Sequence, residues 1–143
     1  LLRTIIEKDA LAWAVASVDN NEIDEINILN ASFLAMNRAI EQLSLKPELL
    51  LIDGNRFKSQ TDMDYQCIVK GDSLYESIAA ASILAKPYRD DYMLKLHEEY
   101  PCYGWKSNKG YPTKKHYEAI AMNGITQYHR KSFALDKQLT LQF

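Results

Sequence analysis

Cysteine is scarce in this sequence. Its two cysteines, Cys67 and Cys102, stand far apart and outside any CxxC spacing. A disulfide scaffold or a zinc site built from thiolates requires several cysteines at short, regular intervals. We therefore expect both residues to be ordinary reduced thiols that pack as small apolar side chains.

Long apolar runs are also missing. No segment approaches the roughly 20 apolar residues that a membrane-spanning helix requires, and residues 1–13 carry charges inside what would be the apolar stretch of a signal peptide. The sequence contains no internal repeat and no glycine-rich phosphate loop. These absences favour a soluble, cytoplasmic protein without a membrane partner.

Charge is distributed unevenly along the 143 residues. The formal net charge of −2 argues against a protein that coats nucleic acid, although a global sum can hide a local basic patch. Residues 1–102 hold ten Lys and Arg against 17 Asp and Glu, whereas residues 103–131 hold six bases against Glu118 alone. The basic stretch fits a solvated surface as well as it fits phosphate contacts. The length and the 47% hydrophobic fraction predict a single domain over residues 1–143.

Hydrophobic periodicity predicts the elements of the first half. Residues 9–18 are an almost unbroken apolar run, typical of a buried strand, with a helix as the alternative. Apolar residues then recur at steps of three and four, which predicts a helix that buries one face. They are Ile26, Leu29, Phe33, Met36, Ile40 and Leu43. The apolar run 48–52 predicts a strand from the middle of a parallel sheet, and Asp53 lies where that strand ends.

The second half is less regular. Residues 55–66 are polar and indicate a loop, and residues 67–69 indicate a short strand. Residues 78–84 predict a helix that Pro87 should kink or end, because proline removes an intrahelical hydrogen bond. Residues 114–122 predict a further helix, followed by an Asn-Gly pair that is typical of a helix end.

Two carboxylates, Asp53 and Asp72, occupy positions where functional residues are common. Asp53 closes a buried strand, and Asp72 precedes a helix 19 residues later, so a sheet could bring both to one edge. Mg²⁺ prefers carboxylate and water oxygens, and a metal pair can stabilise the attacking and leaving oxygens of a phosphoryl displacement. The alternative is structural, with Asp53 capping a turn and Asp72 capping a helix.

An ordered series of short motifs resembles the bacterial ribonuclease HII (type 2 ribonuclease H) family. The series consists of EIDEINILNASFLAMNRAI at 22–40, LIDGN at 51–55, KGDS at 70–73, AAASILAK at 79–86, NKGYPT at 108–113 and HRKSF at 129–133. One block alone would carry little weight, whereas six in the family's order extend the resemblance over nearly the whole chain.

The resemblance implies a fold and an activity. The fold is α/β, a ribonuclease H-like mixed sheet flanked by helices. The activity is that of an endonuclease, a hydrolase that cuts the RNA strand of RNA/DNA hybrids and cuts DNA at embedded ribonucleotides during replication and repair. The implied chemistry is two-metal phosphodiester hydrolysis with Mg²⁺ or Mn²⁺, leaving a 3′-hydroxyl and a 5′-phosphate. Asp53 and Asp72 match two of the family's four catalytic, metal-binding carboxylates.

The same resemblance implies nucleic-acid contacts. Tyr111 matches a tyrosine that lies beside the nucleotide after the ribonucleotide, where an aromatic face can pack on a deoxyribose but would crowd a 2′-hydroxyl. The alternative is a half-buried structural tyrosine. Lys109 and Thr113 are candidate phosphate contacts, with Lys86 and Arg130 as further candidates that could instead be merely solvated.

Some positions depart from the family pattern. Family members often carry valine where this chain has Pro87, and histidine where it has Asn108, so helix straightness and one local contact are in question. His129 lies in a matched motif, for which we expect a structural role or a role at the edge of the substrate.

Nothing in residues 1–21 matches the family's first strand, with its Asp-Glu pair, or the Gly-Arg-Gly that follows. We therefore expect a partial catalytic domain that lacks the first strands and leaves a gap in the sheet. A buried, unpaired backbone group costs about 1 to 3 kcal/mol, so the gap implies a truncated product, pairing with an amino-terminal piece, or rearrangement or dimerisation. The alternative function is a catalytically inactive nucleic-acid-binding or structural fragment.

Overall fold

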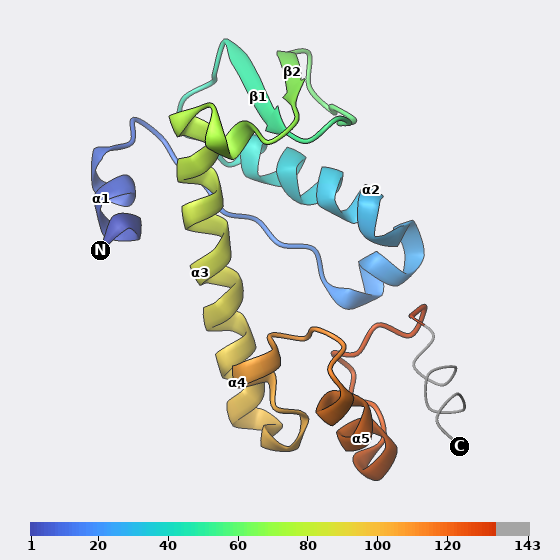
Figure 1. The fold of residues 1–143 in the computed structure, drawn as a ribbon. Helices are drawn as coiled ribbons and strands as arrows, with labels where there is room; N and C mark the ends of the chain where they lie inside the picture. Colours follow the sequence, from blue (N-terminus) through green and yellow to red (C-terminus); the bar gives the residue numbers. More distant parts are fainter. Residues whose placement is uncertain (134–143) are drawn as a thin grey trace. The chain divides into compact units, whose positions relative to one another are not determined.

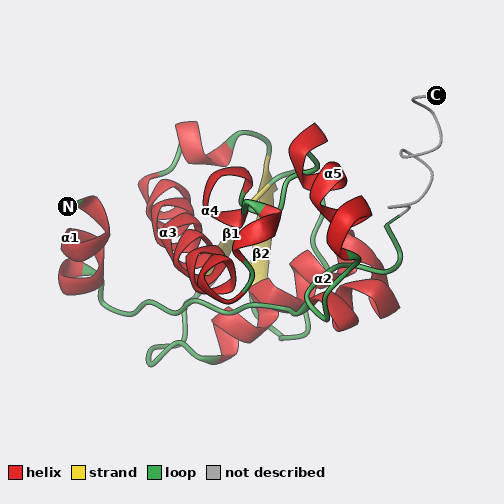
Figure 2. Cartoon of the chain, turned by 90° about the horizontal axis from the view of Figure 1, so that it is seen from below, coloured by secondary structure: helices red, strands yellow, loops and turns green. Residues whose placement is uncertain are grey.

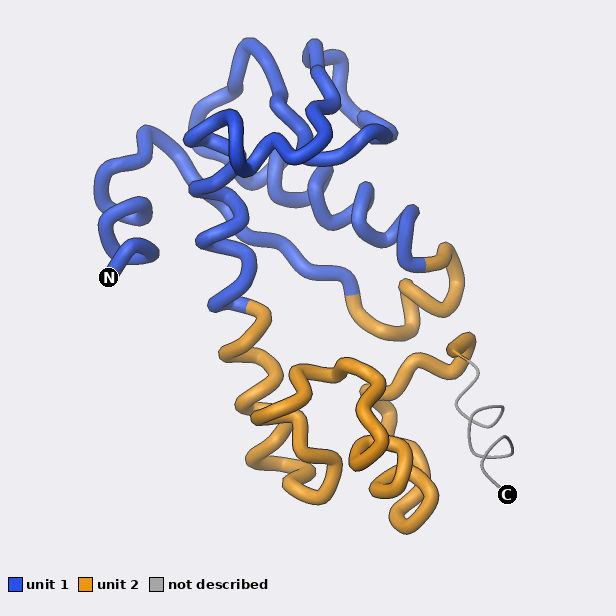
Figure 3. Tube along the Cα trace, viewed as in Figure 1, with its two compact units in different colours: residues 1–18, 28–88 blue, residues 19–27, 89–143 orange. Residues whose placement is uncertain are grey.

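The computed structural model describes residues 1–133 as two compact units (Figure 3). Unit 1 comprises residues 1–18 and 28–88, and the described part of unit 2 comprises residues 19–27 and 89–133. Each unit has its own buried cluster. The single catalytic domain expected for residues 1–143 stays a prediction.

Helices predominate in the described residues, together with one pair of strands (Figures 1 and 2). The elements in chain order are α1 Leu2–Asp9, α2 Asn20–Glu41, β1 Leu49–Asp53, β2 Asp64–Ile68, the 3₁₀ helix η1 Gly71–Ser73, α3 Glu76–Glu99, the 3₁₀ helix η2 Pro101–Tyr103, α4 Trp105–Asn108 and α5 Lys114–Asn123. Along residues 1–133, no helix combines the length and the apolar character that crossing a membrane requires.

The sheet of unit 1 is a parallel pair, β1 and β2, in which Leu49 faces Asp64 and Asp53 faces Ile68. Leu50 and Ile52 point to the same side of β1 and are both buried, as the period of two in a strand requires. Helix α2 covers that side and packs Phe33, Met36 and Ile40 against the two strand residues and Phe57. The predicted α/β class and the strand at 48–53 are confirmed, and the predicted core face of the helix is confirmed for Phe33, Met36 and Ile40.

The second strand begins earlier than expected. Residues 64–66 were predicted as loop because they are polar, yet they pair with β1. All three are exposed in β2, which explains why they carry no apolar signal. The predicted strand at 67–69 overlaps β2 only at its end, since Val69 lies outside the strand and is 64% exposed.

The strand predicted at 9–18 is wrong. Helix α1 ends at Asp9, and residues 10–19 form neither helix nor strand (Figure 1). A strand is stable only when a neighbouring backbone takes up its N–H and C=O groups. The hydrogen bonds of this segment involve side chains instead. The guanidinium of Arg38 donates to the carbonyl of Ser17, and the indole N–H of Trp13 donates to the carbonyl of Glu7 in α1.

Two predicted helices differ from expectation in continuity. Helix α2 is interrupted at Asn27, whose φ of 66° and ψ of 165° belong to a region that non-glycine residues rarely adopt. The apolar stripe is therefore split after Ile26, and Leu29 remains 46% exposed. Helix α3 does not end at Pro87 but continues to Glu99, so proline removes one hydrogen bond without terminating the helix.

The core of unit 2 is aromatic. Leu96 of α3, Tyr103, Trp105 and Ile120 of α5 form its buried cluster, and Tyr103 stacks on Trp105 with ring centroids 5.1 Å apart. The helix predicted at 114–122 is confirmed, with Gly124 as its C-cap at a positive φ of 77°. Such a backbone conformation at a helix end favours glycine.

Asn37 ties α2 to the loop before β2 within unit 1. Its side chain is 1% exposed. The amide donates to the carbonyls of Phe33 and Lys58 at 2.8 and 2.9 Å, and its oxygen accepts from the backbone N–H of Gln60 at 2.8 Å. A buried amide with three partners fixes this loop against the helix.

We expect Asn37→Leu to lower the free energy of unfolding by about 2 to 4 kcal/mol. The substitution removes the three hydrogen bonds of the Asn37 amide, and a hydrogen bond contributes about 0.5 to 1.5 kcal/mol to stability. Urea unfolding followed by circular dichroism measures the change. Gln42→Ala, an exposed amide just after α2, is the control and should shift the midpoint little. Equal stability of Asn37→Leu and Gln42→Ala would contradict the role of Asn37 in fixing the loop before β2.

Candidate functional site

The structure places Asp53 next to the turn that carries Asp72, inside unit 1. Asp53 is the last residue of β1, and its Oδ1 accepts a hydrogen bond from the backbone N–H of Gly71 at 2.9 Å. The next residue, Asp72, lies in η1. Both aspartates are exposed. The sheet thus brings one predicted carboxylate into contact with the neighbour of the other, and the assignment of both as site residues stays a prediction.

Gly71 packs closely against Ile78 because it has no side chain. A Cβ at Gly71 would lie 2.5 Å from Cδ1 of Ile78, 3.4 Å from Cβ of Ile68 and 3.5 Å from Oδ1 of Asp53. The residue before it, Lys70, adopts the left-handed region with φ of 57°, which turns the chain sharply from β2 into η1. The missing side chain therefore leaves room for Ile78, and the hydrogen bond to Asp53 holds the turn at the end of β1.

The two carboxylates match a hard divalent cation in ligand type. Mg²⁺ and Mn²⁺ take oxygen ligands. Within residues 1–133, however, no three His, Cys, Asp or Glu side chains gather in an arrangement that could hold a metal ion. Asp53 and Asp72 can therefore supply part of a ligand set, and further oxygen ligands are needed to complete it.

The other predicted contacts fall on both units. Lys86 is exposed on α3 in unit 1, whereas Lys109, Tyr111, Thr113 and Arg130 belong to unit 2. Tyr111 is 59% exposed, and its contact with nucleic acid stays a prediction beside the alternative of a structural loop tyrosine.

Arg89 organises the loop that carries Lys109 and Tyr111. Its Nη1 donates to the hydroxyl of Tyr111 at 3.2 Å, its Nη2 donates to the carbonyl of Lys109 at 3.0 Å, and its guanidinium lies 4.9 Å from the centre of the Tyr111 ring. A planar guanidinium can make all three contacts at once, which an ammonium cannot. Sequence reasoning missed Arg89, although it follows three residues after a matched motif in the same helix.

Asn108 lies at the start of the same loop and makes two side-chain hydrogen bonds with backbone groups. Its amide donates to the carbonyl of Tyr103 at 2.7 Å, and its side-chain oxygen accepts from the N–H of Gly110 at 2.9 Å. Lys109, at φ of 49°, and Gly110, at φ of 79°, both adopt the left-handed region. The asparagine therefore supports a tight turn at the position where family members often carry histidine.

Thr113 has a structural task. It is the N-cap of α5, and its hydroxyl accepts from the N–H of His116 at 3.3 Å. A threonine cap typically stabilises a helix by about 1 kcal/mol. Its expected phosphate contact stays a prediction beside this established contact.

Arg130 is partly buried, with its guanidinium 4.9 Å from the centre of the Phe133 ring. Burial and the positive charge of Arg89 lower the pKa of Arg130, whereas the carboxylate of Asp24 raises it. The charges of Arg89 and Asp24 therefore act on Arg130 in opposite directions.

His129 lies inside the aromatic core of unit 2, consistent with the structural alternative for this residue. It is 5% exposed, and its ring stacks on that of His116 at 5.4 Å and 14°. Its Nδ1 accepts from the N–H of Thr126 at 2.9 Å, so the neutral ring carries its proton on Nε2. Burial and the neighbouring His116 lower the pKa of His129 to about 4.

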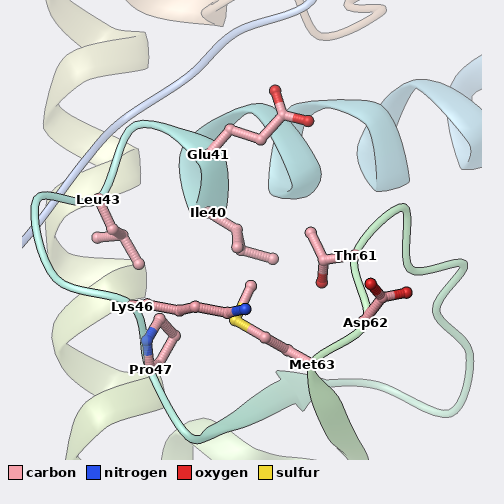
Figure 4. Close-up of a pocket in the computed structure, with 8 residues that line it drawn as sticks. All are labelled: Ile40, Glu41, Leu43, Lys46, Pro47, Thr61, Asp62 and Met63. Carbon is pink, nitrogen blue, oxygen red and sulfur yellow. The ribbon is translucent and has the colours of Figure 1, made fainter.

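Unit 1 contains a surface cavity. It is lined by the end of α2, the loop after it and the segment before β2, including Ile40, Lys46, Asp62 and Met63 (Figure 4). None of the predicted site residues lines it, and it contributes nothing to the argument for the site.

Comparison with known proteins gives one consistent result. The model of the family described as Ribonuclease HII matches residues 1–136. The Ribonuclease HII of Bacteroides thetaiotaomicron is 65% identical to this chain, and the alignment covers 99% of this chain and 72% of that protein. The Ribonuclease HII of Phocaeicola vulgatus is 63% identical with the same coverage.

A solved structure shows the same fold. The ribonuclease H2 from Pyrococcus horikoshii matches with a TM-score of 0.67 at 22% identity. The match covers 85% of this chain and 65% of that protein. At this identity the likeness concerns the fold, and it agrees with the predicted ribonuclease H-like class.

We expect stability to fall between pH 6.5 and pH 4 because of His129. A histidine with an unperturbed pKa of 6.5 in the unfolded chain and about 4 in the folded one binds its proton more tightly when unfolded. Its penalty is absent above pH 6.5, grows as pH falls, and reaches at most about 3 kcal/mol near pH 4, since one pKa unit corresponds to about 1.4 kcal/mol.

Thermal unfolding at pH 7, 5.5 and 4 measures this effect. His129→Asn, whose Oδ1 can take the place of Nδ1 as the acceptor for the N–H of Thr126, should show a flatter pH dependence over this range. His97→Gln, in the last turn of α3, is the matched control and should retain the original dependence. The same slope in all three proteins would rule out His129 as its cause.

Proposed function

This chain belongs to the ribonuclease HII family, and we propose that it is the part of an endonuclease that carries two of its catalytic carboxylates and much of its nucleic-acid surface. The proposed substrates are RNA/DNA hybrids and DNA with embedded ribonucleotides. The observation that carries the proposal is the hydrogen bond from Gly71 to Asp53, which holds Asp53 beside the turn of Asp72.

Asp53 and Asp72 are the proposed ligands of Mg²⁺ or Mn²⁺. When bound, such a metal supplies Lewis-acid stabilisation of charge on the phosphate and lowers the pKa of a coordinated water. The chain's own contribution is orientation. The N–H of Gly71 binds one oxygen of Asp53, and such outer hydrogen bonds fix the direction of a ligating carboxylate. Hydrolysis by this route leaves a 3′-hydroxyl and a 5′-phosphate.

Tyr111 is the proposed sensor of the junction between RNA and DNA. Its ring is exposed, and Arg89 holds it by its hydroxyl and by one face. A ring held in one orientation can pack on a deoxyribose and exclude a 2′-hydroxyl, whereas a freely rotating ring discriminates poorly. Arg89 is therefore a positioning residue in this proposal.

Lys109, Thr113, Lys86 and Arg130 are the proposed phosphate contacts. Phosphate contacts supply much of the affinity of nucleic-acid-binding proteins and carry no sequence information. Three of these four lie in unit 2, which contains the whole basic stretch 103–131.

A second candidate function is nucleic-acid binding without cleavage. The described residues bring together no set of three metal ligands, and a two-metal site needs more than two carboxylates. The test therefore uses two proteins. One is the 143-residue chain. The other, called the extended chain, is preceded by the Asp-Glu strand and Gly-Arg-Gly segment that the family resemblance implies, taken from the Bacteroides thetaiotaomicron relative.

We expect the extended chain to cut a DNA duplex with one embedded ribonucleotide in Mg²⁺ or Mn²⁺, and the 143-residue chain to bind it without cutting. In the extended chain, Asp53→Asn or Asp72→Asn should lower turnover by at least about 100-fold, the scale on which loss of one electrostatic contact at a reacting centre is measured. Gel analysis of the cleaved strand gives both rates.

Asp62→Asn is the control for these variants, because Asp62 is an exposed aspartate in the loop before β2. It should cut at the original rate. Retained cleavage by Asp53→Asn would remove Asp53 from the proposed ligands. Cleavage by the 143-residue chain alone would mean that other carboxylates complete the site.

We expect Arg89→Lys to reduce the preference of the extended chain for junction substrates. Lysine keeps the charge but loses the paired hydrogen bonds to Tyr111 and Lys109, and one such bond is worth about 1 kcal/mol, or about fivefold. The measurement is the ratio of kcat/KM on the single-ribonucleotide duplex to that on a continuous hybrid. Lys95→Arg on the same helix is the control. An unchanged ratio in Arg89→Lys would show that Tyr111 needs no support from Arg89.

A further inference from the structure

A short helical segment of unit 2 holds the backbone on both sides of Arg130. Residues 20–26 form the first part of α2, before the interruption at Asn27. The amide of Asn20 donates to the carbonyl of Gln127 at 2.8 Å and to that of His129 at 3.2 Å. His129, directly before Arg130, is therefore held by a residue 109 positions earlier in the sequence.

Asp24 binds the backbone that follows Arg130. Its Oδ2 accepts from the N–H of Lys131 at 2.7 Å, and its Oδ1 accepts from the N–H of Ser132 at 3.0 Å and from the Ser132 hydroxyl. Burial raises the pKa of Asp24, but the bonds from Ser132 and Lys131 and the charge of Lys131 outweigh this and lower it. A carboxylate with three donors is a strong and directional anchor.

The two anchors act from one helical face. Asn20 and Asp24 are four residues apart, so they lie one turn apart on the same side of the helix. The turn is itself fixed by a reciprocal cap: the N–H of Asp19 donates to Glu22 at 3.2 Å, and the N–H of Glu22 donates to Asp19 at 2.9 Å. The segment thus binds Gln127 and His129 before Arg130, and Lys131 and Ser132 after it.

We propose that Asn20 and Asp24 are positioning residues for Arg130, which they hold in place to contact a phosphate of the nucleic-acid backbone. The inference rests on the phosphate role proposed above for Arg130. A guanidinium whose backbone is already ordered loses less conformational freedom when it binds, which strengthens binding without any new contact.

The sign of the change in binding distinguishes this positioning role from a purely electrostatic effect of Asp24. A carboxylate close to a phosphate repels it, so through charge alone the removal of Asp24 should strengthen nucleic-acid binding. If Asp24 acts by holding Arg130 instead, its removal should weaken binding. The two roles predict opposite signs.

The experiment measures binding of the extended chain to a labelled duplex with one embedded ribonucleotide, in EDTA to prevent cleavage, across a series of salt concentrations. Arg130→Gln should bind several-fold more weakly, and the slope of log K against log salt should fall in magnitude by about 0.9, the value of one phosphate contact to a duplex. Asp24→Asn should weaken binding about 3- to 10-fold with a similar loss of slope. Asp24→Asn/Arg130→Gln should bind like Arg130→Gln alone.

Two further variants separate geometry from charge and from folding. Glu25→Gln removes the same charge from the next, exposed residue of the segment and should bind as tightly as the parent or slightly more tightly. Asp24→Glu keeps the charge but displaces the carboxylate by one methylene, and should weaken binding as Asp24→Asn does. This second variant keeps the test decisive if Asp24→Asn unfolds.

The outcomes separate the two proposals. If Arg130→Gln weakens binding while the Asp24 variants bind like Glu25→Gln, the positioning role is overturned and the phosphate role of Arg130 stands. If Arg130→Gln leaves both affinity and slope unchanged, the phosphate role is overturned, and the positioning role falls with it. Weakening by Asp24→Asn that adds to that of Arg130→Gln would show that Asp24 acts elsewhere.

Discussion

The parallel pairing of β1 with β2 determines where both predicted catalytic carboxylates lie. Its register sets Asp53 opposite Ile68, and the N–H of Gly54 continues the ladder to the carbonyl of Ile68 at 2.9 Å. The chain then needs only the left-handed turn at Lys70 to return Gly71 to Asp53. A slip of one residue would move every side chain of β1 to the other face and would carry Asp53 away from this turn.

In unit 2, side chains hold irregular backbone in place. Loops lack the repeating hydrogen bonds of helices and strands, so their polar groups need other partners. Asn108 serves the turn at Gly110, Arg89 binds the carbonyl of Lys109, and Asp24 takes the N–H groups after Arg130. The stacked rings of Tyr103 and Trp105 are buried in the same unit.

The sequence predicted those features that depend on local pattern. Strand β1 and the core face of α2 follow from apolar periodicity, and α5 follows from its length and its terminal Asn-Gly. The strand expected at 9–18 failed because an apolar run does not reveal whether a partner strand exists. The support residues Arg89, Asn20 and Asp24 were missed because their partners lie 20 to 108 residues away in the chain. Only the resemblance pointed to Tyr111.

The contacts of Asp24 show how an acidic residue can serve a surface that is proposed to bind an acidic polymer. Were Asp24 paired directly with the guanidinium of Arg130, the charge available to a phosphate would be reduced. Instead its oxygens are taken up by backbone N–H groups and a hydroxyl, which partly offset its negative charge with fixed dipoles. Arg89 follows the same arrangement, since it donates to a hydroxyl and a carbonyl. Asp24 and Arg89 thus both bind neutral groups of the unit's loops.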